Sequence, residues 1–235
     1  MIVVTMCASN HLRYLNWLLG SIKKFEPEIQ IVCYLVNCTS SELQNIRKSF
    51  NMLNLTIYNT NNVHTCQYLR KGRPCGKISY HKIEAIIKGL SYQQDILWLD
   101  ADTFLLGDVS YFRRILQNND LAILVRPGWN KKKSYFNAGV IGIKYNKNMI
   151  EFVDYWDNLC KKDLSNMEEW HKLQHDQGRL ILTYRKFEKV IRLHQLPMKF
   201  NADKYFFNTR IIHMRGGAKF KNKFKKIYAS KISKP

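Results

Sequence analysis

The stretch "ILWLDADTFLLGD" (residues 96–108) reads as a short buried strand followed at once by two carboxylates. Asp100 and Asp102 are one residue apart, and they come directly after the four apolar residues of the strand. Two like charges held this close are costly to bury unless a positive group neutralises them. The stretch therefore predicts a strand whose carboxyl end carries a site for something positive.

On both sides of this stretch, apolar runs typical of strands alternate with segments whose apolar residues recur at helical spacing. The expected strands lie at residues 2–6, 29–36, 55–59, 96–99, 121–127 and 136–146, and the expected helices at 11–25, 40–50, 78–90, 151–160 and 175–184. Such alternation predicts an α/β fold with a mainly parallel central sheet flanked by helices. Ligands of such sheets bind beyond the carboxyl ends of the strands, which is where the two carboxylates fall.

The composition fits a single domain with a sizeable core, because 46% of the 235 residues are hydrophobic. We expect this domain to span residues 1–218, followed by a basic, aromatic-containing tail at 219–235. Six cysteines occur without a CxxC pair, which favours reduced, packed thiols over disulfides or a zinc site. The sequence shows no signal peptide or membrane-spanning run, so we expect a cytoplasmic protein or one peripheral at the cytosolic face of a membrane.

The net charge of +20 predicts attraction to an anionic partner: nucleic acid, an anionic membrane or an acidic substrate. In the tail, lysines are mixed with Phe, Ile and Tyr, which suits attachment to an anionic membrane, with a solvated tail as the alternative. A nucleic-acid-binding protein is the alternative of another class, and its binding would depend steeply on salt.

A second motif, H-x-x-G-x-x-K, is formed by His213, Gly216 and Lys219 in "IIHMRGGAKFK". An imidazole added to two carboxylates favours Mn²⁺ as the bound ion. Mg²⁺ is the alternative. A glycine lets the backbone approach a phosphate closely, and a lysine can neutralise it. Together with the carboxylate pair, this motif predicts a site for a divalent metal and a diphosphate.

Two weaker motifs lie between these. In "FNAG" (residues 136–139), Asn137 offers an amide that suits sugar hydroxyls and stands near Gly139; the alternative is an ordinary turn. In "HDQG", Asp176 and Gln177 open a helical run, and the alternative is a simple N-terminal cap.

The four motifs occur along the chain in the order DxD, FNAG, DQ and H-x-x-G-x-x-K, and this ordered set resembles that of the GT-A fold nucleotide-diphospho-sugar transferases. The resemblance is to glycosyltransferase family 8, which contains glycogenin and bacterial lipopolysaccharide galactosyltransferases, and it spans roughly the whole chain. It implies a single GT-A (Rossmann-like) domain in which Asp100, Asp102 and His213 hold Mn²⁺. It also implies that Asp176 and Gln177 lie near the anomeric carbon as catalytic residues.

The resemblance further implies a set of donor-binding residues. The end of the first strand would line the uridine pocket, and the basic residue of "SYHKI" (residues 79–83) would approach the donor. The implied residues are Ala8, Ser9, Asn10, Lys82, Asp100, Ala101, Asn137, Gly139, Gly216 and Lys219.

Several positions depart from the family pattern. Phe220 and Lys221 stand where the family usually has Pro-Trp, Gly178 replaces an Asp after "DQ", and "NKKKS" (residues 130–134) replaces an acidic residue before "FNAG". Lys82 stands in place of an arginine, which removes a bidentate donor. The second and third of these departures bear on which sugar is held.

The implied activity is transfer of a hexose from a nucleotide-diphosphate sugar, with UDP favoured, to a hydroxyl of a glycan, a lipid-linked molecule or a protein. Family resemblance favours retention of the anomeric configuration. The alternative within the same class is inversion with Asp176 as the general base.

Overall fold

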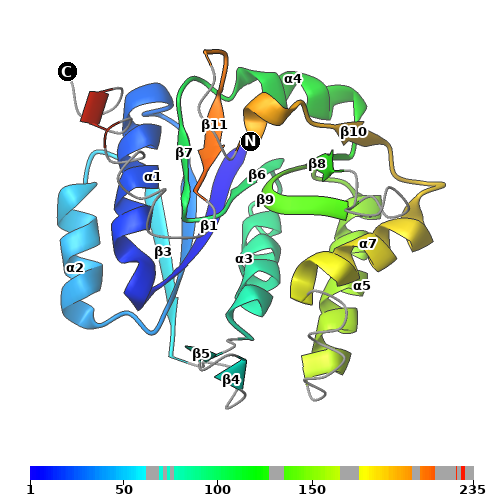
Figure 1. The fold of residues 1–235 in the computed structure, drawn as a ribbon, viewed down its shortest axis with the longest axis horizontal. Coiled ribbons are helices and arrows are strands. Elements are labelled where there is room, and N and C mark those ends of the chain that lie inside the picture. The colour runs from blue at the N-terminus through cyan, green and yellow to red at the C-terminus, as the bar shows by residue number, and fades with distance from the viewer. Residues whose placement is uncertain are drawn as a thin grey trace.

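The computed structural model describes residues 1–61, 69–70, 73–74, 77–126, 135–164, 175–202, 207–214, 226 and 229–230. Its centre is a seven-stranded sheet in the order β10-β8-β9-β6-β1-β2-β3 (Figure 1). The strands are β1 (Ile2–Ala8), β2 (Ile31–Val36), β3 (Leu55–Thr60), β6 (Ile96–Leu99), β8 (Leu121–Arg126), β9 (Tyr135–Ile143) and β10 (Leu193–Gln195). Neighbouring strands are parallel except that β9 runs antiparallel to β6 and to β8. The predicted α/β fold with a mainly parallel sheet is therefore confirmed.

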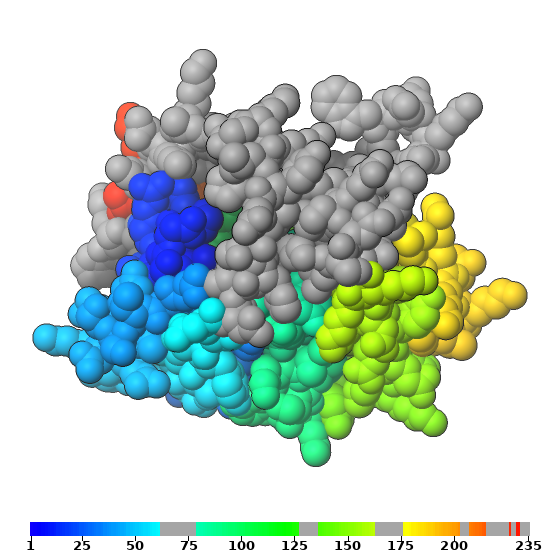
Figure 2. Space-filling model, turned by 90° about the horizontal axis from the view of Figure 1, so that it is seen from below, coloured from blue at the N-terminus to red at the C-terminus, as the bar shows by residue number. Residues whose placement is uncertain are grey.

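Helices cover both faces of this sheet. They are α1 (Leu12–Phe25), α2 (Ser40–Ser49), α3 (His81–Leu90), α4 (Ser110–Asn118), α5 (Lys147–Leu164) and α7 (His175–Phe187), with short 3-10 helices η1 (Ser9–His11), η2 (Lys77–Tyr80) and η3 (Met198–Phe200). Apolar residues of α1, α2 and α4 pack in one core layer, and those of α3, α5 and α7 pack in the other. Viewed from below, α2, β3, α3 and α5 follow one another across the molecule in the order that Figure 1 shows (Figure 2).

The alternation of side chains along β1 explains why both core layers form. Val3 and Cys7 face the layer of α1, whereas Ile2 and Val4 face the layer of α3, and all four are buried. A central parallel strand covered on both faces reads as a continuous apolar run for this reason. In α1 the residues expected on the buried face have no exposed surface: Leu15, Leu18, Leu19 and Ile22.

Two small antiparallel ladders accompany the main sheet. One pairs β4 (Leu69–Arg70) with β5 (Arg73–Pro74). The other pairs β7 (Thr103–Leu105) with β11 (Ile211–His213), and it joins the chain just after β6 to a segment more than a hundred residues later. This second ladder brings His213 of the H-x-x-G-x-x-K motif next to Asp100 and Asp102.

The cysteines with described side chains, Cys7, Cys33, Cys38 and Cys160, are buried, as expected of packed thiols. Among the described helices, none combines the length and the apolar composition that a membrane crossing requires. The predicted tail at 219–235 lies outside the described residues apart from positions 226, 229 and 230, as does its boundary with the domain.

Candidate active site

The two carboxylates sit on a turn that is fixed by backbone hydrogen bonds. The backbone N–H and the hydroxyl of Thr103 both donate to the carbonyl oxygen of Asp100, at 2.9 and 2.7 Å. The Asp100 N–H in turn donates to the carbonyl oxygen of Gly139 on β9, at 2.9 Å. These bonds hold Asp100 and Asp102 at the carboxyl end of β6.

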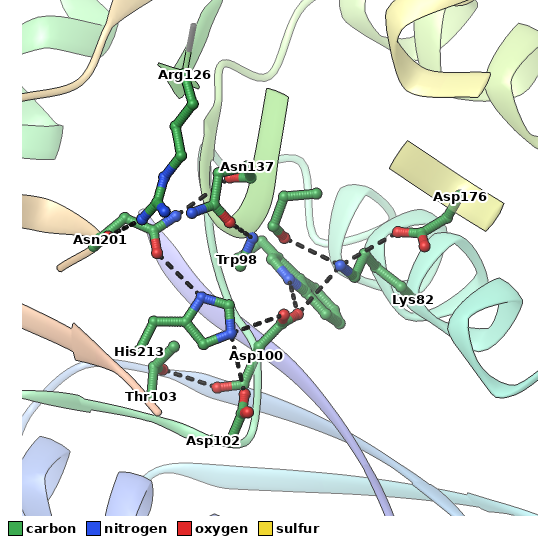
Figure 3. Close-up of polar contacts among 12 residues, drawn as sticks. Lys82, Trp98, Asp100, Asp102, Thr103, Arg126, Asn137, Asp176, Asn201 and His213 are labelled. Atoms are coloured by element: carbon green, nitrogen blue, oxygen red, sulfur yellow. Dashed lines mark hydrogen bonds and ion pairs between the residues drawn. The ribbon is translucent and has the colours of Figure 1, made fainter. Parts of the chain in front are cut away.

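His213 reaches this turn because β11 pairs with β7. The backbone of His213 lies opposite Thr103 in that ladder, and the Met214 N–H donates to the Asp102 carbonyl oxygen at 2.8 Å. As a result, His213 Nε2 lies 3.5 Å from Asp100 Oδ2 and 3.3 Å from Asp102 Oδ1 (Figure 3). One ligand atom from each of the three residues lies within 4.8 Å of the other two.

This donor set fits a divalent metal ion. Two carboxylates and one imidazole, with their ligand atoms converging on one point, form a mixed oxygen and nitrogen site of the type that Mn²⁺ accepts. The backbone of Gly139 makes room for the imidazole, because a Cβ atom at that position would lie 2.1 Å from ring atoms of His213. The glycine of "FNAG" is therefore needed for His213 to occupy its place.

A buried lysine ties two predicted motifs together. Lys82, near the start of α3, places its Nζ 3.1 Å from Asp100 Oδ1 and 3.3 Å from Asp176 Oδ2, and it donates to the Ala138 carbonyl oxygen at 3.0 Å (Figure 3). These acceptors match the three N–H groups of an ammonium. Trp98 Nε1 also donates to Asp100 Oδ1, at 2.9 Å.

The charges around Lys82 shift the pKa of both partners. Burial alone would lower the pKa of Lys82, but the carboxylates of Asp100 and Asp176 more than offset this and raise it above its ordinary value. Burial alone would raise the pKa of Asp100, whereas Lys82 and then His213 hold it below its ordinary value. Lys82 is therefore charged and Asp100 is ionised at neutral pH.

These groups line a cavity of about 300 Å³ at the carboxyl ends of the strands. Its volume is at the small end of the range typical of ligand sites. Three carboxylates, those of Asp100, Asp102 and Asp176, face a single described cation, Lys82, across its lining. When the histidines are neutral, three negative charges and one positive charge leave the described lining with a net charge of −2. One divalent cation balances this charge.

The cavity brings together two of the four motifs, the carboxylate pair and Asp176-Gln177, whereas Asn137, Gly139 and His213 are not among its lining residues. Its lining includes Ala8, Lys82, Asp100, Ala101, Asp102, Asp176 and Gln177. Ser9 and Asn10 lie in η1 next to it, and neither is among the lining residues. Gly216 and Lys219 lie outside the described residues.

Asn137 lies behind the cluster of Asp100, Asp102 and His213, where it is fully buried. Its Oδ1 accepts the Gly139 N–H at 3.4 Å, and its Nδ2 has no hydrogen-bond partner among the described residues. An unpaired buried donor costs about 1–3 kcal/mol, so a ligand group that accepts from it would be stabilising.

Sequence reasoning missed three residues of the site. His11 and Tyr14 line the cavity, with ring centroids 5.9 Å apart, and they follow directly on the predicted Ala8-Ser9-Asn10 segment. Extending that prediction by one helical turn would have found them. Asn201, which contacts His213 at 3.0 Å, belongs to no motif, so the sequence gives no signal for it.

Comparison with known proteins shows the fold. No protein-family model matches the sequence, and no curated protein matches it. Solved structures match it over nearly its whole length. The glycosyltransferase GlyE of Streptococcus pneumoniae superposes with a TM-score of 0.65 at 16% identity, over 100% of this chain and 60% of that one. This chain thus spans about three fifths of the length of GlyE.

Two shorter structures are matched almost end to end. The galactosyltransferase LgtC, solved with donor and acceptor sugar analogues, superposes with a TM-score of 0.59 at 13% identity over 100% of this chain and 98% of that one. Mouse xyloside xylosyltransferase 1 gives a TM-score of 0.56 at 9% identity, over 93% of this chain and 98% of that one. The chain therefore has the GT-A fold of glycosyltransferases, as its motifs predicted.

Proposed function

We propose that the protein is a metal-dependent glycosyltransferase that moves a hexose from a nucleotide-diphosphate sugar, UDP being the favoured nucleotide, to a hydroxyl acceptor. The observation that carries the proposal is the convergence of Asp100, Asp102 and His213 beside a cavity at the carboxyl edge of a GT-A sheet. The acceptor hydroxyl would belong to a glycan, a lipid-linked molecule or a protein. A nucleic-acid-binding role gives no reason for this convergence.

Asp100, Asp102 and His213 would hold the ion, with Mn²⁺ favoured and Mg²⁺ as the alternative. When bound, the ion supplies Lewis-acid stabilisation of the charge that develops on the leaving diphosphate. Lys82 keeps Asp100 ionised and in place, so this carboxylate is ready to act as a ligand. Gly216 and Lys219 would contact the same diphosphate, and this remains a prediction.

The donor would lie along the edge formed by β1 and β6. In the proposal, the end of β1, Ala8 to Asn10, borders the nucleoside, and the rings of His11 and Tyr14 offer an aromatic wall for the base. Ala101, between the two metal-binding carboxylates, borders the same space. The ammonium of Lys82 is occupied by protein acceptors, so we propose that it acts on the donor through Asp100 and Asp176.

For the sugar, we propose Gln177 as a polar contact, because it lines the cavity next to Asp176. Asn137 is proposed as a second contact on the resemblance and on its unpaired Nδ2, although it is fully buried and does not line the cavity. Gly139 contributes by leaving space for His213.

The product is expected to retain the anomeric configuration of the donor. A general base for inversion must reach the acceptor hydroxyl, but Asp176 is only 4% exposed and its Oδ2 faces Lys82 at 3.3 Å. The anomeric coupling in an NMR spectrum of fresh product measures this directly. An α-linked donor should give an α-linked product; a β-linked product would contradict retention and assign the base to Asp176.

Thermal unfolding of the protein with each member of a panel of nucleotide sugars, in the presence of Mn²⁺, identifies the donor. At a hundredfold excess over its Kd, the cognate donor should stabilise the fold by about 2.7 kcal/mol, which corresponds to a rise in Tm of about 5–10 °C for a chain of this size. The same donor with EDTA, and the matching sugar 1-phosphate with Mn²⁺, are the controls and should give a much smaller rise. If no donor raises the Tm and Mn²⁺ has no effect, the proposed function is wrong.

A further inference from the structure

We propose that Asn201 is a positioning residue that holds His213 with its proton on Nδ1, so that the Nε2 lone pair faces Asp100 and Asp102. The contact that carries this is between His213 Nδ1 and Asn201 Oδ1, at 3.0 Å (Figure 3). The inference rests on the proposed metal-dependent function, and it adds the residue that prepares one ligand for the ion.

The amide of Asn201 can have only one orientation here. Asn201 is fully buried, and its Nδ2 donates to the carbonyl oxygen of Asn137 at 3.2 Å. If the amide were reversed, its oxygen would face that carbonyl oxygen, and two acceptors would meet without a hydrogen between them. The amide oxygen therefore faces His213.

This orientation determines the tautomer of His213. Because an amide oxygen can only accept, the imidazole nitrogen that faces it must carry the proton. In the neutral ring, the lone pair is then on Nε2, which is the nitrogen 3.3 Å from Asp102 Oδ1 and 3.5 Å from Asp100 Oδ2. Metal-binding histidines generally have their second nitrogen held in this way, and the second partner tunes affinity.

The backbone around Asn201 is held rigidly against β11. The Asn201 N–H donates to the Met198 carbonyl oxygen at 3.1 Å, closing η3, and the His213 N–H donates to the Ala202 carbonyl oxygen at 2.8 Å. Gly139 packs against the Cε1 and Nδ1 atoms of the same ring, where a Cβ atom would lie 2.1 Å away. Asn201 and His213 are thus fixed relative to each other by main-chain bonds, and the side-chain bond selects the ring nitrogen that carries the proton.

The test compares Mn²⁺ affinity, measured by the EPR signal of free Mn²⁺, in two variants of similar size. Asn201→Leu cannot accept the Nδ1 proton, and its affinity should fall about 10- to 100-fold. Asn201→Asp can accept the proton but cannot donate to Asn137, so its affinity should stay within about threefold of the wild type or increase, since a carboxylate partner raises ligand basicity. Loss of affinity in both variants would assign Asn201 a merely structural role.

Asn146→Leu is the matched control. Like Asn201, Asn146 forms hydrogen bonds with both its amide oxygen and its amide nitrogen. Its Oδ1 accepts the Met149 N–H at 2.9 Å and its Nδ2 donates to Asp120 Oδ1 at 2.8 Å, away from the cavity. This variant should lose stability and keep its Mn²⁺ affinity. An Asn201→Leu protein that binds Mn²⁺ like the wild type would overturn this inference alone, whereas a wild type that binds no Mn²⁺ would overturn the proposed metal site and the inference with it.

A measurement on the wild type keeps the inference testable if the variants do not fold. A long-range ¹H–¹⁵N correlation spectrum of metal-free protein at pH 8 separates the two imidazole tautomers, and the His213 signals are assigned by their loss in His213→Gln. A protonated Nδ1 supports the inference. A neutral ring whose only proton is on Nε2 overturns it.

Discussion

Asp102→Asn is expected to lower kcat/KM for Mn²⁺-dependent sugar transfer about a thousandfold, which corresponds to about 4 kcal/mol of transition-state stabilisation. The Asp102 side chain is 36% exposed, and its carboxylate faces His213 Nε2 at the point where the ligand atoms converge. An amide is a weaker ligand for a hard cation than a carboxylate, so Mn²⁺ affinity should fall with activity. Steady-state kinetics with the cognate donor and Mn²⁺ titration by EPR measure the two effects.

The fold of this variant should be unaffected, because the change removes a partly exposed charge next to a like charge. Thermal unfolding of Asp102→Asn should therefore match that of the wild type. Asp154→Asn makes the same change in charge at an exposed position on α5, and it should leave both activity and Mn²⁺ affinity unchanged. Activity within threefold of the wild type in Asp102→Asn would remove the assignment of Asp102 as a metal ligand.

Lys82→Met is expected to lower the free energy of unfolding at pH 7 by about 3–5 kcal/mol, because it leaves buried carboxylates without their cation. Lys82 and Asp176 are 5% and 4% exposed, so the Asp176 carboxylate gains little water when the ammonium is removed, whereas the Asp100 side chain is 26% exposed. Urea denaturation of the wild type and the variant measures the difference. Lys88→Met, on the exposed face of the same helix, should change stability by much less.

The stability of the wild type and that of Lys82→Met should also change in opposite directions as the pH falls. In the wild type the pKa of Asp100 lies below its ordinary value of 3.8, so the stability it contributes is fully present above that pH and is lost as the pH falls further. In Lys82→Met, burial raises the pKa of the Asp100 carboxyl without Lys82 to offset it, and stability should rise as the pH falls from 7 toward 5. If stability depends on pH in the same way in both proteins, and Lys82→Met lowers the free energy of unfolding by less than about 1 kcal/mol, Lys82 does not neutralise these carboxylates.

The sequence predicted the layers of the fold because burial on two faces leaves a direct pattern. A strand such as β2 is a continuous apolar run, and α1 repeats its leucines on one face. The cluster of Asp100, Asp102 and His213 was also predictable, since each residue belongs to a motif with fixed spacing. The antiparallel direction of β9 was not predicted, because periodicity shows which side of a strand is buried and gives no information on its direction.

The residues that contact the cluster of Asp100, Asp102 and His213, such as Asn201 and Lys82, could not be predicted from the sequence. Asn201 acts on His213 only because η3 and β11 pack together, and one asparagine in "KFNADK" (residues 199–204) has no distinguishing spacing. The role of Lys82 depends on three partners from distant segments: Asp100 just after β6, Ala138 in β9 and Asp176 in α7. Such contacts between distant segments follow from packing, which a single sequence does not specify.

The pairing of β7 with β11 has a consequence for the order of folding. The core strands β1, β2 and β3 are connected by short segments, whereas β7 must wait for a partner that is made more than a hundred residues later. Closing such a long loop is entropically costly and comes late unless other contacts have already shortened it. The cluster of Asp100, Asp102 and His213 is then completed only after the sheet has formed, and it does not exist in a nascent chain before β11 is synthesised and docked.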